Sequence, residues 1–111
     1  MLYGSESRRE PRFAANHQIE VRVLGPSQFR AGPGSILDIS ENGLSFTFRR
    51  QLEPGDLVTI EYEGCVVVGE VRHCRERLYA NQQQFVIGLS IKRVAKGEEA
   101  WRQLIRQCCG R

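Results

Sequence analysis

Two short polar motifs hold the residues of this sequence that are best suited to binding a ligand. Arg8, Arg9 and Arg12 stand close together near the start of the chain. A guanidinium group can bond a phosphate, or the O6/N7 edge of guanine, through two parallel hydrogen bonds. By themselves the three arginines also fit a solvated basic tail, because blocks of like charge are often disordered.

The second motif spans residues 38–43 and has the form Asp-x-Ser-x-x-Gly. An ionised Asp38 accepts hydrogen bonds from guanine N1–H and N2–H₂, and the Ser40 hydroxyl can donate or accept one. Gly43 would let the backbone turn closely around a ligand, and the Asn42-Gly43 dipeptide favours positive φ. The same residue types also make an ordinary turn that only closes a hairpin.

The segments that must position these motifs alternate between apolar and polar residues. This period of two predicts six strands, over residues 17–24, 35–39, 44–48, 57–62, 66–77 and 84–92. We expect a turn at Gly32-Pro33-Gly34 and a bulge or bend at Gly69. Short strands with frequent turns predict a sandwich or a barrel, and six of them fit a small closed antiparallel barrel.

The apolar period changes near Gly97. Apolar residues then stand at i, i+3, i+4 and i+7, which predicts one amphipathic helix with Trp101 as its core anchor and Gly110 at its end; they are Trp101, Leu104, Ile105 and Cys108. The apolar stripe must cover either one barrel opening or a partner helix. We therefore expect an all-β fold with one C-terminal helix, divided into a flexible arm (1–13), a six-stranded antiparallel barrel (14–95) and the helix (96–111).

Composition limits the class of protein. The 111 residues are enough for one domain, and 41% hydrophobic with 26% charged residues is typical of a globular chain. The net charge of +3 fits an anionic partner without requiring one. No apolar run approaches the roughly 20 residues of a membrane span, and the first residues lack the order of a secretory signal. We expect a cytoplasmic protein with no membrane insertion.

The sequence offers no catalytic or metal-binding pattern. The four cysteines lack zinc-ligand spacing and are expected to be free thiols. His17 and His73 have no nucleophile at a suggestive spacing, and neither a phosphate-binding glycine loop nor a nucleophile elbow occurs. We expect no metal, no catalytic residues and no enzymatic activity.

The two motifs, in this order and in an all-β frame, resemble those of the PilZ domain family. Arg8, Arg9 and Arg12 match its Arg-Arg-x-x-Arg motif, and the Asp-x-Ser-x-x-Gly motif matches at all three of its fixed positions. The resemblance runs from Arg8 to about Ile91, and residues 86–89 resemble the last strand of the family.

This resemblance implies a receptor for the bacterial second messenger cyclic di-GMP, with no other cofactor. Asp38, Ser40 and Gly43 would form a platform for guanine, and the arm arginines would close over the ligand. A downstream protein would then bind the altered surface, and no nucleic-acid partner is expected.

Two alternative functions remain open. A single-stranded nucleic-acid-binding barrel needs exposed aromatic side chains for base stacking. Phe46 and Phe48 share an alternating face with Leu44, which indicates core positions instead. A ligand-independent adaptor, acting through protein contacts alone, is the other alternative; adaptors of this family usually have degraded motifs, whereas both motifs are intact here.

Overall fold

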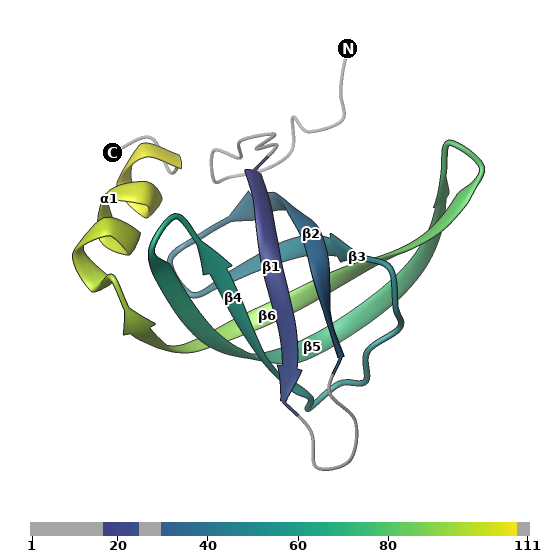
Figure 1. The fold of residues 1–111 in the computed structure, drawn as a ribbon, viewed down its shortest axis with the longest axis horizontal. Helices are drawn as coiled ribbons and strands as arrows, with labels where there is room; N and C mark the ends of the chain where they lie inside the picture. Colours follow the sequence, from purple (N-terminus) through teal and green to yellow (C-terminus); the bar gives the residue numbers. More distant parts are fainter. Residues whose placement is uncertain (1–16, 25–29, 109–111) are drawn as a thin grey trace.

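The computed structural model describes residues 17–24 and 30–108, which form six strands and one helix (Figure 1). The elements are β1 (His17–Leu24), β2 (Arg30–Ile39), β3 (Gly43–Phe48), β4 (Leu57–Tyr62), β5 (Cys65–Tyr79), β6 (Gln82–Lys96) and α1 (Glu98–Cys108). All pairings are antiparallel, and the strands close into a barrel in the order β1-β2-β3-β6-β5-β4. The predicted fold class is therefore confirmed. The predicted arm (1–13) lies outside the described residues.

The barrel core follows from the alternation in the strands. In β1, Ile19, Val21 and Val23 are buried while the residues between them are exposed. Phe46 and Phe48 of β3 are also buried, as predicted, and their rings meet edge to face with centroids 6.4 Å apart. The aromatic side chains of β3 thus stabilise the interior and are not available for base stacking.

Helix α1 packs onto the same core and begins directly after a glycine. Gly97 has φ of 74°, and its carbonyl oxygen accepts hydrogen bonds from the Trp101 amide at 2.9 Å and the Cys65 thiol at 3.5 Å. Trp101 is buried in the core and Leu104 and Ile105 pack against it, so the described part of the helix stripe covers the protein's own barrel and not a partner helix. Within the described part of the chain, no helix is long and apolar enough to cross a membrane.

The predicted turn at Gly32-Pro33-Gly34 is wrong. Gly32-Pro33-Gly34 lies inside β2 and forms no turn. Pro33 pairs with β1 on one side only, since the pairing of β2 with β3 begins at Ser35, so its missing N–H removes no bond to β3. A Cβ on Gly34 would lie 2.4 Å from the Thr47 carbonyl oxygen, so this glycine permits the close approach of β2 and β3.

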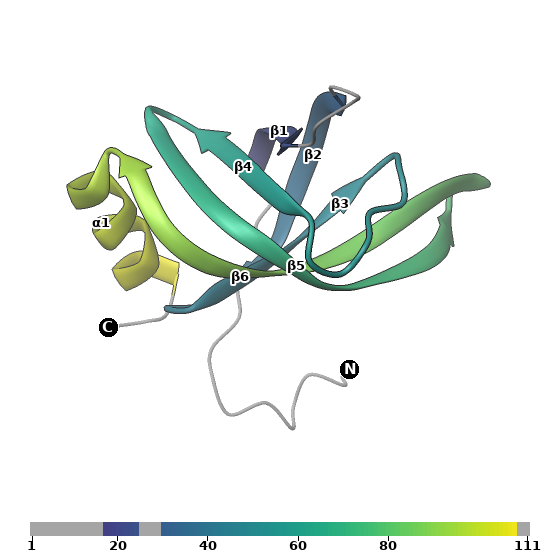
Figure 2. The same ribbon diagram turned by 90° about the horizontal axis from the view of Figure 1, so that it is seen from below.

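Strands β5 and β6 form a hairpin that is longer than predicted and projects from the barrel (Figures 1 and 2). The pairing of β4 with β5 ends at Glu70, and that of β3 with β6 ends at Phe85, whereas β5 and β6 stay paired as far as Tyr79 and Gln82. The predicted bulge is confirmed by a register shift between Val68 and Gly69.

Candidate functional site

The first wall of the candidate site is the end of β2, where a bulge sets the direction of Asp38. The register with β3 shifts between Ile36 and Asp38, which leaves Leu37 as the extra residue. Asp38 then pairs with Ser45. Bulges of this kind redirect a side chain that a regular strand would place elsewhere.

The turn after β2 is held by hydrogen bonds within the turn and by one from β6. The Ser40 amide and hydroxyl both donate to the Gly43 carbonyl oxygen, at 2.8 and 3.2 Å, and the Ile91 amide donates to the Asn42 carbonyl oxygen at 2.9 Å. The predicted positive φ is wrong for both Asn42 and Gly43. Gly43 is required for a different reason: a Cβ there would lie 2.7 Å from the Leu89 carbonyl oxygen of β6.

The opposite wall is supplied by β5, which carries a second bulge. Its register with β6 shifts between Val71 and His73, so Arg72 is the extra residue. As a result, the consecutive residues Arg72 and His73 both line the site, together with Arg75. His73 pairs with Gly88, where a Cβ would meet the imidazole ring at 2.3 Å.

The two walls enclose one surface groove of about 410 Å³. It brings a carboxylate, two hydroxyls and the cationic side chains of β5 to one place; the polar lining residues are Asp38, Ser40, Ser45, Arg72, His73 and Arg75. Such a groove offers acceptors for the edge of a base and donors for phosphate oxygens.

The PilZ domain family model matches residues 6–110, which is nearly the whole chain. The chain belongs to the PilZ domain family. PilZ domains form a family of cyclic di-GMP receptors and are in general not enzymes. No curated protein and no solved structure shows a significant match to this PilZ domain.

The groove of this PilZ domain gathers the predicted site residues that the structure describes. Asp38, Ser40 and Gly43 all line it, whereas Arg8, Arg9 and Arg12 lie outside the described residues. Their role in binding therefore stays a prediction.

Sequence reasoning missed the contribution of β5 to the groove. The alternation of β5 could have identified Arg75 as a candidate. Arg75 follows Cys74, which is part-buried, in a predicted strand, so the Arg75 side chain faces outward. Nothing local to the sequence showed that this face meets the end of β2.

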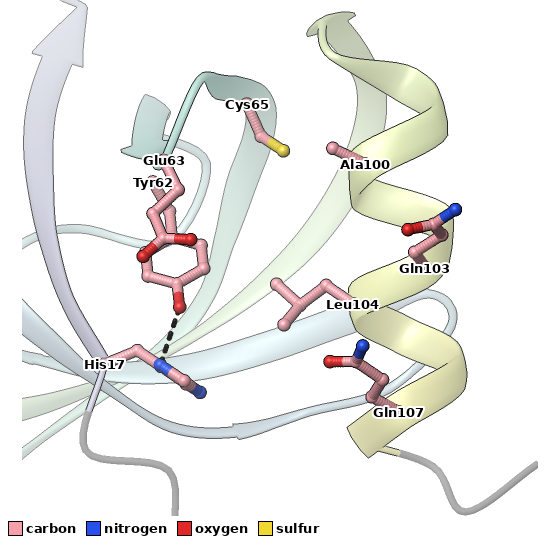
Figure 3. Close-up of a pocket in the computed structure, with 8 residues that line it drawn as sticks. All are labelled: His17, Tyr62, Glu63, Cys65, Ala100, Gln103, Leu104 and Gln107. Carbon is pink, nitrogen blue, oxygen red and sulfur yellow. Dashed lines mark hydrogen bonds between the residues drawn. The ribbon is translucent and has the colours of Figure 1, made fainter.

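A second cavity of this PilZ domain, of about 420 Å³, lies between α1 and the barrel (Figure 3). On its barrel side the Tyr62 hydroxyl and His17 Nδ1 share a hydrogen bond of 2.8 Å, and Leu104 of α1 faces them. Its described lining includes Glu63 but no lysine or arginine, so it suits an anionic ligand poorly. Among the described residues there is also no group of three His, Cys, Asp or Glu side chains that could hold a metal ion.

Proposed function

We propose that this PilZ domain binds cyclic di-GMP in the groove and signals the bound state to a downstream protein. The observation that carries the proposal is that the groove joins the Asp38–Gly43 motif to cationic side chains of β5. The Asp38 carboxylate supplies acceptors for guanine N1–H and N2–H₂, and the Ser40 hydroxyl supplies a further polar contact. The groove volume of about 410 Å³ is within the usual range for small-molecule sites, roughly 300–1,000 Å³.

The charge of the groove fits the phosphates of the ligand. Cyclic di-GMP carries two phosphodiesters, and Arg72 and Arg75 offer charge-assisted hydrogen bonds, which are stronger than neutral ones. Asp38 is the one carboxylate among the described residues that line the groove. A guanine edge on Asp38 and phosphates toward β5 would therefore satisfy both kinds of group.

The first residue of β1 lies close to Asp38, so the preceding arm can contact a ligand bound in the groove. His17, the first residue of β1, pairs with Ile36, two residues before Asp38 on β2. Arg12 precedes His17 by five residues, and an extended chain covers about 3.3–3.6 Å per residue, so the arm backbone can reach roughly 17 Å from this point. In our proposal Arg8, Arg9 and Arg12 close over the bound dinucleotide. Closure would change the surface offered to the downstream protein.

Calorimetric titration of the full chain with cyclic di-GMP tests the proposal. Asp38→Ala and Arg12→Ala should each weaken binding about ten- to 100-fold, because hydrogen bonds to charged groups are worth about 1.5–3 kcal/mol. Glu61→Gln and Arg93→Ala are matched controls on exposed positions outside the groove, and both should bind like the wild type.

The titration also separates the alternative functions. If the wild type bound no cyclic di-GMP, the receptor proposal would be wrong and the ligand-independent adaptor would take its place. If single-stranded oligonucleotides bound more tightly than cyclic di-GMP, the nucleic-acid-binding barrel would take its place. Circular dichroism of each variant shows whether a loss of binding reflects a loss of fold.

A further inference from the structure

Strand β5 has an open edge where the β5–β6 hairpin projects from the barrel (Figures 1 and 2). Its pairing with β4 ends at Glu70, and the residues directly before β4 make two further backbone hydrogen bonds to Val71. From there to Tyr79, the part of the chain that the structure describes gives β5 no strand partner other than β6. Residues 72–79 are exposed, apart from Cys74, which is part-buried. We call this stretch of β5 the open edge.

The turn of the hairpin determines which backbone groups point out of the open edge. Ala80 and Asn81 have positive φ, of 53° and 63°, as in a two-residue hairpin turn, so the flanking residues Tyr79 and Gln82 form a hydrogen-bonded pair. No register shift occurs from this pair back to His73. Because bonded and non-bonded pairs alternate along antiparallel strands, every second residue of the open edge directs its N–H and C=O groups away from β6. These residues are Cys74, Glu76 and Leu78. An edge with such groups is a template for one more strand.

The side chains of the open edge are mainly cationic. Alternation places Arg75 and Arg77 on the face of β5 that lines the groove, and Arg72 is the bulge residue. The single carboxylate of residues 72–79, that of Glu76, lies on the other face and accepts a hydrogen bond from Gln83. Three arginines against one glutamate give the open edge a net positive charge.

Arg77 is held in place without losing its capacity to bind a carboxylate. Its Nε atom donates to Gln84 Oε1 at 3.3 Å, and its guanidinium carbon lies 5.5 Å from the centroid of the Tyr79 ring. The bond to Gln84 uses only one of the guanidinium donors, so the others can bond an acidic group beside the strand.

Charge decides which kind of strand fits the open edge. Residues directly opposite each other in an antiparallel pair lie on the same face, and like charges in such a pair are destabilising. A second copy of this chain, paired antiparallel along most of the open edge, would place its arginines opposite or diagonal to Arg75 and Arg77. A strand with carboxylates at alternate positions would instead pair them with these arginines. Apolar residues between the carboxylates would lie on the face of Leu78, which is 74% exposed.

We propose that the open edge of β5 binds an acidic β-strand of the downstream protein, which extends the sheet by one strand. In this mode of recognition the main-chain hydrogen bonds supply affinity, and alternate side chains supply specificity. The arginines admit a strand rich in carboxylates and disfavour a second copy of this chain, as charges on edge strands commonly do. The inference rests on the proposed function in assigning the strand to the downstream protein.

Binding of synthetic peptides with capped ends to the full chain tests the inference. The probe alternates glutamate with valine and is as long as the open edge, and a second peptide has lysine in place of glutamate. Fluorescence anisotropy should show that the glutamate peptide binds about tenfold more tightly than the lysine peptide, or better. Amide hydrogen exchange should slow on binding at the residues whose N–H groups point outward, which are Cys74, Glu76 and Leu78.

Two matched pairs of variants separate charge from backbone pairing. Arg77→Glu should weaken binding of the glutamate peptide about tenfold, because a like-charge pair replaces an opposite-charge pair. Arg93→Glu makes the same change at an exposed position on β6 within the barrel and should bind like the wild type. Glu76→Pro removes an outward N–H without removing a bond to β6 and should weaken binding about tenfold, whereas Glu76→Ala keeps this N–H and should bind at least as tightly as the wild type.

Each outcome bears on one proposal. The open edge would be ruled out as a docking site if the glutamate peptide did not bind, if Arg77→Glu and Arg93→Glu lost affinity equally, or if Glu76→Pro bound like the wild type. Dimers of the wild type that protect the same amides without peptide would overturn the acidic strand in favour of a second copy. A wild type that binds the glutamate peptide but no cyclic di-GMP would support the open edge and overturn the receptor proposal. The reverse result would overturn the open edge alone.

Discussion

The His73 imidazole occupies the space directly over Gly88, its partner on β6. A Cβ at position 88 would lie 2.3 Å from the His73 Nε2 atom and 2.4 Å from Cε1. The ring therefore covers a backbone position that only glycine leaves open. Because the bulge at Arg72 turns His73 toward the groove, Gly88 determines where the floor of the groove lies.

Gly88→Ala should reduce cyclic di-GMP affinity by about tenfold, equal to about 1.4 kcal/mol, while the barrel stays folded. The new methyl group must displace the exposed His73 ring, which is easier than moving the backbone of either strand. Calorimetry measures the affinity and thermal unfolding measures the stability. Gly32→Ala is the control, because a Cβ there would meet only the Phe48 ring, at an ordinary 3.7 Å. Equal affinities in Gly88→Ala and the wild type would contradict the inference that the position of the His73 ring over Gly88 shapes the groove for the ligand.

Gly43→Ala should behave differently, with a loss of stability as well as of affinity. Here the added Cβ would lie 2.7 Å from the Leu89 carbonyl oxygen, and β3 can relieve this contact only by moving away from β6. Forced insertions into a packed site cost about 1–3 kcal/mol. Thermal unfolding should show the loss, whereas Asn42→Ala, which changes an exposed side chain in the same turn, should unfold near the wild-type temperature. A Gly43→Ala protein as stable as the wild type would show that the strands tolerate the shift.

The barrel was predictable because its strongest signals are local. Ile19, Val21 and Val23 alternate with polar residues and all three are buried, and the stripe led by Trp101 packs onto the core as one of its two expected arrangements. Alternation and helical period are consequences of which side of an element faces water. They hold wherever one face of the element is buried.

The shape of the site was not predictable from the same signals. Pro33 between two glycines favours a turn by local preference, but pairing with β1 holds it in a strand. The bulges at Leu37 and Arg72 arise from the register between strands that are distant in sequence. The sequence therefore identified Asp38 and Ser40 as candidates without showing that Arg72 and His73 lie across the groove from them.

Phe46→Ala should be among the most destabilising substitutions in the barrel. The side chain is fully buried and contacts the Phe48 ring edge to face, so truncation leaves a large cavity in the core. Phe→Ala changes in cores cost about 3–5 kcal/mol. Urea unfolding followed by Trp101 fluorescence measures the change, and Leu78→Ala, at an exposed position, should stay within about 0.5 kcal/mol of the wild type. A loss below about 1 kcal/mol would mean that the core repacks around the cavity.

The Cys65 thiol should make the fold less stable at alkaline pH. Burial, and secondarily the negative charge of Glu63, raise the pKa of Cys65 above its ordinary value of 9.0, and its thiol donates to the Gly97 carbonyl oxygen where α1 begins. The folded state holds this proton more tightly than the unfolded state, so its contribution is complete below pH 9 and is lost as pH rises through the folded pKa. Urea unfolding at pH 8 and pH 10 should therefore show a larger fall in the free energy of unfolding for the wild type than for Cys65→Ala. Cys74→Ala, which keeps the buried thiol, should fall as the wild type does, and equal falls in all three proteins would show that Cys65 does not contribute.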